Sequence, residues 1–322
     1  MTAASDRSLR YRKPRCEGYI CLLGPTASGK SDLAIWLAQQ FPCEIISVDS
    51  GMIYRGMDIG TAKPAPQILK QIPHHLINIC DPAEAYSAAK FRTDALKLIN
   101  EISGRGRIPL LVGGTMLYFR VLQQGISALP QADTAVRDSL AKEANQYGWQ
   151  KLHERLQQID PAAAARIAPS DSQRLQRALE VYMLTGKTLT QLCAENPLSP
   201  LPYHALNIAL APKSRSQLNS KISSRFIQML QNGLVAEVEV LFKRGDLNCN
   251  LPSMRAVGYR QVWQYLNDEL GYDEMQERAI IATRQLAKRQ MTWLKTWQNI
   301  LWFDSEDSDL RKKVLDNIKL LS

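Results

Sequence analysis

The segment Gly24–Ser31 constrains the fold of this chain most, because it matches the pattern G-x-x-x-x-G-K-[S/T] at every position. An apolar run, Tyr19–Leu23, precedes it, and a helical pattern, Lys30–Gln40, follows. Strand, glycine-rich turn and helix in this order favour a backbone that curls around a polyphosphate at a helix N-terminus. The predicted phosphate-binding residues are Gly24, Pro25, Thr26, Ala27, Ser28, Gly29, Lys30 and Ser31, with Ser31 as a Mg²⁺ ligand.

Strands and helices are predicted to alternate in the first part of the chain. Four apolar runs indicate buried strands, at Tyr19–Leu23, Glu44–Val48, Leu76–Ile79 and Ile108–Val112. Helical patterns separate them, at Lys30–Gln40 and Ser87–Ile102. We therefore expect an α/β fold, with a parallel, P-loop NTPase-like sheet flanked by helices. Ligands of such sheets bind beyond the carboxyl ends of the strands, where Asp49, Asp81 and Thr115 lie.

The pattern becomes helical after about Gly125. Helices are expected at Thr134–Tyr147, Trp149–Gln158, Pro161–Ile167 and Asp171–Leu184, before a proline-rich break. An alternating run, Ala205–Ala211, then predicts a strand that rejoins the sheet, and residues 214–297 are again helical. We expect an all-helical insertion domain (126–202) within a core made of 19–125 and 203–303. Residues 1–18 are expected to be a flexible extension and 304–322 a polar tail with a short amphipathic helix.

Composition narrows the class of protein. Of 322 residues, 45% are apolar and 22% charged, which is typical of a globular protein. No apolar run approaches the roughly 20 residues of a membrane-spanning helix, and the N-terminus has no apolar signal core, so we expect a cytoplasmic protein without membrane contact. Cysteines and histidines lack zinc spacing. Nothing requires a partner subunit, and we expect a monomer.

The net charge of +9 fits a polyanionic partner such as a nucleic acid. Residues 1–18 hold five basic and two acidic side chains, so three of the nine excess charges lie in this segment. Charge alone therefore leaves RNA binding open.

Asp49 ends the run Glu44–Val48 and should lie beside the phosphate-binding turn. A carboxylate there can hold Mg²⁺ through water or accept a proton from a nucleophile, and the alternative is a helix N-cap. The run Ile108–Val112 ends in Gly-Gly-Thr, whereas a triphosphatase usually has a magnesium-binding Asp at such a strand end. The sequence therefore allows phosphoryl transfer without requiring it.

Five segments together resemble the tRNA dimethylallyltransferase family: GPTASGKS, SVDSGMIYRGMDIGTAKP, LLVGGTMLYF, DSQRLQRALEVY and SMRAVGYRQVW. They extend from about Cys21 to Trp297, and the segment around Asp49 is far more specific than the phosphate-binding turn. The resemblance implies transfer of a dimethylallyl group from dimethylallyl diphosphate to N6 of the adenosine immediately 3′ of the anticodon, in tRNAs that read codons beginning with U.

The resemblance also implies three catalytic residues and Mg²⁺ as cofactor. Lys30 and the phosphate-binding turn would stabilise the departing diphosphate, and Thr115 would add a hydroxyl to it. Asp49 would be the general base that takes the N6 proton. From the residues alone, Thr115 could instead cap the helical pattern Met116–Leu122.

A larger set of residues is implied to contact tRNA. It consists of Asp49, Ser50, Gly51, Met52, Thr115, Arg137, Gln173, Arg174, Leu175, Gln176, Arg177, Arg255, Ala256, Val257, Gly258, Tyr259, Arg260, Lys288, Arg289, Gln290, Met291, Thr292, Trp293, Leu294 and Lys295.

Plainer interpretations remain for these residues. Arg174 and Arg177 could pair with Asp171 or Glu180, and Tyr259, Trp293 and Trp297 could belong to the core. Arg284, Lys288 and Lys295 could form a solvated helical face.

Two other functions share these features. An ATP-dependent kinase of a nucleotide or small metabolite would consume ATP without RNA. A non-catalytic RNA-binding protein would keep its RNA affinity after Lys30→Ala and form no product.

Overall fold

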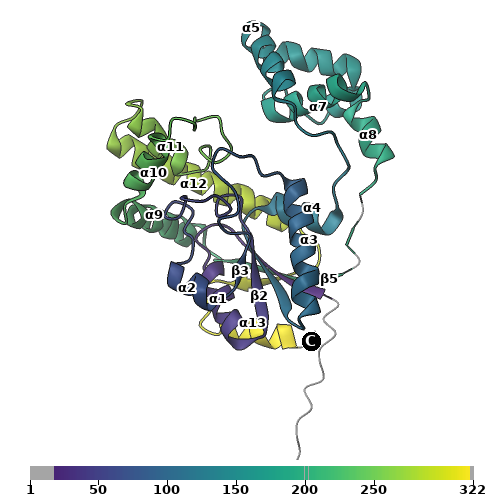
Figure 1. The fold of residues 1–322 in the computed structure, drawn as a ribbon. Helices are drawn as coiled ribbons and strands as arrows, with labels where there is room; N and C mark the ends of the chain where they lie inside the picture. The colour runs from purple at the N-terminus through teal and green to yellow at the C-terminus, as the bar shows by residue number, and fades with distance from the viewer. Residues whose placement is uncertain (1–17, 199, 202, 320–322) are drawn as a thin grey trace, which may run out of the picture. The chain divides into compact units, whose positions relative to one another are not determined.

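The computed structural model describes residues 18–198, 200–201 and 203–319, so the expectation for residues 1–18 lies almost wholly outside the described residues. One parallel sheet has the strand order β3–β2–β4–β1–β5–β6. Its strands are β1 (Gly18–Leu23), β2 (Cys43–Val48), β3 (His74–His75), β4 (Ile108–Gly113), β5 (His204–Ala211) and β6 (Ile300–Asp304). The predicted parallel α/β sheet flanked by helices is confirmed (Figure 1).

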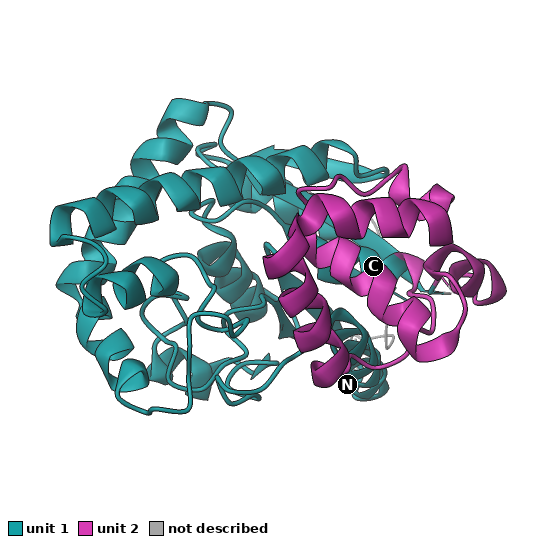
Figure 2. Ribbon diagram, turned by 90° about the horizontal axis from the view of Figure 1, so that it is seen from above, with its two compact units in different colours: residues 1–123, 201–322 teal, residues 124–200 magenta. Residues whose placement is uncertain are grey.

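The chain divides into two compact units, residues 1–123 with 201–322 and residues 124–200 (Figure 2). The first unit contains the sheet with α1 (Lys30–Gln40), α2 (Pro66–Gln71), α3 (Ala88–Gly104), α4 (Met116–Gln124), α9 (Arg215–Gln231), α10 (Leu234–Phe242), α11 (Tyr259–Leu266), α12 (Tyr272–Lys295) and α13 (Leu310–Lys319), α4 ending at the boundary. No helix in the described part of the chain is long and apolar enough to cross a membrane.

The sheet buries both of its faces because alternate residues of each strand point to opposite sides. Ile20 and Leu22 of β1 pack in one core cluster with α1 and α13, which lie side by side (Figure 1). Tyr19, Cys21 and Leu23 pack in the other cluster, with α3, α4 and α9–α12. The near-continuous apolar runs in the sequence follow from this burial on two sides.

The expected strand Leu76–Ile79 is wrong, because the strand is His74–His75. Leu76 and Asn78 have positive φ angles of 61° and 58°, which ends the extended backbone. The amides of Asn78 and Ile79 donate instead to the carbonyls of Met52 and Ile53, in the loop after β2. This segment therefore supports that loop rather than extending the sheet.

The C-terminal segment is more than a polar tail. β6 pairs in parallel with β5 along five residues, and the sequence patterns did not indicate this strand. In α13, Val314 and Ile318 are buried against the same sheet face as α1. Residues 300–319 therefore complete one edge and one face of the sheet.

The second unit consists of helices: α5 (Thr134–Ile159), α6 (Pro161–Ala164), α7 (Ser172–Thr185) and α8 (Leu189–Glu195). Gly148 interrupts α5 with a φ of 81°. This interruption agrees with the two separate helices expected on either side of it. Leu152 and Leu175 belong to a core formed only by this unit. The flanking chain segments meet where the Leu201 amide donates to the Gln123 carbonyl at 3.2 Å.

Close backbone approach at Gly113 sets the spacing of the strand ends. A Cβ atom added to Gly113 would lie 2.0 Å from the Val48 carbonyl oxygen of the neighbouring β2. Gly24 is similarly tight, since a Cβ there would lie 2.3 Å from the Leu210 carbonyl oxygen. Only glycine fits at these positions, so the turns after β1 and β4 lie close to their neighbours.

We predict that Gly113→Ala lowers the free energy of unfolding by about 2 kcal/mol or more, because rigid backbone must move to admit the methyl group. Gly104→Ala is the matched control, since a Cβ on this helical glycine meets nothing within 4 Å. The control should be neutral or stabilising by up to about 1 kcal/mol. Urea unfolding measures both variants, and equal midpoints would contradict the argument.

Candidate active site

The turn Gly24–Ser31 connects β1 to α1 and adopts the conformation that a phosphate cradle needs. Ala27 and Gly29 have positive φ angles of 61° and 80°, and α1 begins directly afterwards. The Lys30 ammonium group lies folded over the turn, donating to the Pro25 carbonyl at 2.5 Å and to Ser28 Oγ at 3.4 Å. Backbone amides and one cation are therefore gathered around the space that an anion would fill.

The Lys30 ammonium group is buried and lies near a second cation, Arg225. Burial, together with the nearby Arg225 guanidinium, lowers the pKa of Lys30 to about 7, although Asp49 opposes both effects. Burial also lowers the pKa of Arg225 itself, against the attraction of Asp49 and Asp32. A buried lysine and a buried arginine beside one turn favour an anionic ligand, whose charge would hold both groups protonated.

Arg225 was missed by the sequence analysis. It lies on α9, far along the chain from the phosphate-binding turn, and no motif surrounds it. It is one arginine among the 40 basic residues, so only the packing of α9 reveals its position.

Asp49 follows β2, and its carboxylate is held by the turn that it begins. Oδ1 accepts the amides of Gly51 at 2.8 Å and Met52 at 3.3 Å. No helix follows, so Asp49 caps a turn rather than a helix. The two amides fix the orientation of the Asp49 carboxylate.

Thr115 follows β4 and is tied to the same turn. Its Oγ1 accepts the Ser50 amide at 3.0 Å, and its own amide donates to the Val48 carbonyl at 3.2 Å. The hydroxyl group is therefore engaged with the segment after Asp49 rather than with the start of α4. Asp49 and Thr115 occupy adjacent strand ends.

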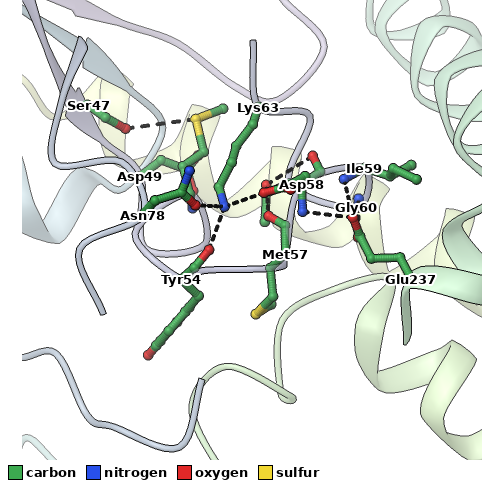
Figure 3. A network of polar contacts seen from close by, with 12 residues as sticks. Ser47, Asp49, Tyr54, Met57, Asp58, Ile59, Gly60, Lys63, Asn78 and Glu237 are labelled. Atoms are coloured by element: carbon green, nitrogen blue, oxygen red, sulfur yellow. Dashed lines mark hydrogen bonds and ion pairs between the residues drawn. The ribbon is translucent and has the colours of Figure 1, made fainter. Parts of the chain in front are cut away.

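Lys63 anchors the polar loop that follows Asp49 (Figure 3). Its side chain is 3% exposed and donates to Asp58 Oδ1 at 2.7 Å, to Asn78 Oδ1 at 2.6 Å and to the Tyr54 carbonyl. Burial lowers the pKa of Lys63, whereas Asp58 beside it raises that pKa. One buried ammonium group thus fastens three segments of the loop together.

Glu237 of α10 fixes the other end of this loop (Figure 3). Its carboxylate accepts the amides of Asp58, Ile59 and Gly60 at 2.7–3.2 Å and the Tyr259 hydroxyl at 2.5 Å. Burial raises the pKa of this hydroxyl, and Glu237 adds to the effect. Tyr259 is fully buried, so it belongs to the core, as its plainer interpretation holds.

A cavity of 1090 Å³ in the first unit joins these parts. Its lining brings together much of the predicted set: residues 26–31 of the phosphate-binding turn, Asp49 to Met52, Arg255 to Tyr259, Arg289 and Gln290. Gly113 and Gly114 also line it, one residue before Thr115.

The cavity offers few direct metal ligands. Within the described ranges, no three His, Cys, Asp or Glu side chains cluster in a way that could hold a metal ion. The Ser31 side chain is exposed at the turn. One hydroxyl group beside a phosphate cradle fits Mg²⁺, which keeps waters and takes most other ligands from a substrate's phosphates.

The predicted RNA-contacting residues of α12 divide into exposed and inward positions. Lys288, Arg289 and Lys295 are exposed, whereas Leu294 is fully buried. Trp293 lies half-buried with the Arg120 guanidinium 5.6 Å from its ring centre. The plainer interpretation of Lys288 and Lys295 as a solvated face therefore stays open, and Leu294 serves to hold the helix.

The predicted residues of the second unit divide in the same way. Arg174 is 69% exposed and pairs only locally, with Asp171 at 3.2 Å. Arg137 and Arg177 both pair with the fully buried Glu180, at 2.8 and 2.6 Å. These two arginines hold the pKa of Glu180 below its usual range, against the effect of burial.

The sequence of the chain matches the family model described as IPP transferase over residues 52–297. The chain belongs to the IPP transferase family. A tRNA dimethylallyltransferase of Coxiella burnetii (strain Dugway 5J108-111) is 57% identical over 93% of this chain and 96% of that protein. A tRNA dimethylallyltransferase 2 of Hahella chejuensis is 56% identical over 90% of this chain and 92% of the relative.

Solved structures agree with this membership of the IPP transferase family. The full-length tRNA isopentenylpyrophosphate transferase of Bacillus halodurans superimposes with a TM-score of 0.69 at 38% identity, covering 95% of both chains. A eukaryotic dimethylallyltransferase acting on tRNA superimposes with a TM-score of 0.79 at 28% identity, covering 94% of this chain and 79% of the other.

We predict that inorganic diphosphate binding draws a proton onto Lys30. The pKa of about 7 in the ligand-free fold lies below the ordinary 10.5, so the group is mostly neutral at pH 8. A bound anion restores the charge, and the uptake should be about one proton per site. For the same reason, the cost of burying Lys30 charged is greatest below pH 7 and fades as the pH rises towards 10.5.

Calorimetry at pH 8 in buffers of different protonation enthalpy counts these protons. Lys30→Met should lose the uptake, whereas Lys221→Met, at another lysine lining the cavity, should keep it. An equal proton count in the wild type and Lys30→Met would refute the assignment.

Proposed function

We propose that this chain transfers the dimethylallyl group of dimethylallyl diphosphate to N6 of the adenosine immediately 3′ of the anticodon, in tRNAs that read codons beginning with U. The observation that carries the proposal is the meeting of three strand ends: the phosphate-binding turn, Asp49 and the Gly114–Thr115 turn. Membership of the IPP transferase family, with relatives named tRNA dimethylallyltransferase, supports this choice among phosphate-binding enzymes.

The phosphate-binding turn stabilises the leaving group. The bond between C1 of the allyl group and the diphosphate oxygen breaks, and its electron pair leaves with the diphosphate. The turn amides, Lys30 and Arg225 then face the charge that develops on that oxygen, in a site partly shielded from water. The diphosphate chemistry calls for a divalent cation, and Mg²⁺ held by Ser31 and phosphate oxygens would neutralise further charge.

Asp49 removes the proton. The exocyclic amine of adenine is a weak nucleophile because its lone pair is delocalised into the ring, so it benefits from losing a proton while the N6–C1 bond forms. With Oδ1 fixed by two amides, we assign Oδ2 of Asp49 as the atom that receives this proton. Thr115 accepts a hydrogen bond from the Ser50 amide and so keeps the turn that carries Asp49 in place beside the diphosphate.

The substrate partner is tRNA, which fits the basic balance of the chain. A base in the anticodon loop can be unstacked and drawn into a cavity more easily than a base in a duplex. Exposed cations on α12, among them Lys288, Arg289 and Lys295, and Arg174 on α7 offer contacts for phosphates.

The test of the function is label transfer. The protein is incubated with labelled dimethylallyl diphosphate, Mg²⁺ and unmodified tRNA, and label is expected in the tRNA. Asp49→Asn should lower turnover by about 10²-fold or more with unchanged tRNA affinity, because the amide still accepts the turn amides but takes no proton. The control, Asp273→Asn, alters an exposed carboxylate in the first turn of α12.

Two results would overturn this proposal. ATP consumption without RNA and without labelled tRNA would indicate a kinase. RNA binding with no label and no ATP consumption would indicate a non-catalytic RNA-binding protein.

We predict different outcomes for the two arginines of α7. Arg174→Ala should weaken tRNA binding and reduce the slope of log K against log salt by about 1, since an exposed phosphate contact is lost. Arg177→Ala should lower the free energy of unfolding by about 2 kcal/mol, because the buried Glu180 loses one of its partners. Filter binding across a salt series and urea unfolding separate the effects. An unchanged salt slope for Arg174→Ala would exclude that contact.

A further inference from the structure

Gln290 is an uncharged residue whose side chain turns inward from α12. It is 8% exposed. Its Oε1 accepts the Thr26 amide of the phosphate-binding turn at 2.9 Å, and its Nε2 donates to the Gly114 carbonyl at 2.9 Å. One side-chain amide therefore bridges the turns after β1 and β4.

The fit around this bridge is tight. A Cβ atom added to Gly114 would lie 2.4 Å from Gln290 Nε2, so a larger residue at position 114 would push the Gln290 amide out of this position. Both ends of the Gln290 amide are used with matching polarity, because its oxygen meets an N–H group and its nitrogen meets a carbonyl. A charged or shorter side chain could not make both bonds.

The bridge also determines which backbone groups face a ligand. The Thr26 amide donates to Gln290 rather than to a ligand. Gln290 therefore anchors the phosphate-binding turn through this N–H group. The Gly114 carbonyl is directed at Gln290 as well, one residue before Thr115. The side chain thus holds the turns on both sides of the diphosphate site.

We propose that Gln290 is a positioning residue that keeps the phosphate-binding turn and the Gly114–Thr115 turn in register for the diphosphate, and that its side chain does not contact RNA. The inference rests on the proposed function for the identity of the anion. On this proposal α12 acts in two ways. Its exposed cations, such as Lys288, contact the RNA, and the buried side-chain amide of Gln290 positions the diphosphate site.

Two substitutions test this role. Gln290→Met keeps the size of the side chain and removes both hydrogen bonds, so affinity for inorganic diphosphate should fall by about 10-fold or more and KM for dimethylallyl diphosphate should rise in step. The dissociation constant for tRNA should stay within about 2-fold of the wild-type value. The matched control is Gln285→Met, at an exposed glutamine of the same helix.

Gln290→Glu supplies a readout that a purely structural role would not move. The glutamate keeps an acceptor for the Thr26 amide but places a carboxylate oxygen against the Gly114 carbonyl. Because burial raises the pKa of a carboxyl group, lowering the pH should protonate it and restore the missing donor. The ratio of variant to wild-type diphosphate affinity should therefore recover as the pH falls from 8 to 6.

Calorimetry with inorganic diphosphate, filter binding with tRNA and urea unfolding decide the outcome. If Gln290→Met keeps the wild-type diphosphate affinity, the proposal is overturned. If the variant loses tRNA affinity alone, the proposal is also overturned, because Gln290 would then contact the RNA. If Gln290→Met fails to fold, the pH profile of Gln290→Glu decides: recovery supports the role, and a flat ratio overturns it. Diphosphate binding is measured without transfer, so a failed transfer assay in the wild type counts against the proposed function and not against this inference.

Discussion

Backbone contact between the ends of β4 and β2 governs the geometry of the whole site. At Gly113 the two strands are so close that a methyl group would overlap the Val48 carbonyl. The residues that follow these strands, Asp49 and Thr115, are thereby held together, and the Ser50 amide completes the link. The phosphate-binding turn joins them because β1 lies beside β4 in the sheet. Strand order and two glycines thus bring the proposed anion cradle and the proposed base to the lining of one cavity.

The long loop after Asp49 is ordered by polar groups rather than by apolar packing alone. Lys63 satisfies carbonyl and side-chain oxygens from three segments, and Glu237 satisfies three successive amides. Burying charged groups in this way is costly unless every partner is present, so these hydrogen bonds oppose rearrangement of the loop. That rigidity suits a loop that carries the proposed general base, because the orientation of Asp49 need not be established anew in each catalytic cycle.

Local patterns predicted what local interactions determine. The turn at Gly24–Ser31, the helix from Lys30 and four of the six strands (β1, β2, β4 and β5) carry their signals within a few residues. The expected strand Leu76–Ile79 was wrong because Leu76 and Asn78 adopt left-handed backbone and the Asn78 amide bonds to the distant loop at Met52. β6 was missed because its short run is recognisable as a strand only from its pairing with β5. Arg225, Glu237 and Gln290 have no motif, since their roles arise from helices that return to the sheet late in the chain. Similarly, the spacing of Arg174 and Arg177 does not reveal that only one of them meets a buried carboxylate.

The helical unit leaves and re-enters the sheet-bearing unit at one point, where Leu201 and Gln123 share a backbone hydrogen bond. Because this segment has adjoining ends and a core of its own, its length and surface can change while the register of β4, β1 and β5 stays untouched. Changes within residues 124–200 can therefore leave in place the strand ends that carry the phosphate-binding turn, Asp49 and Thr115.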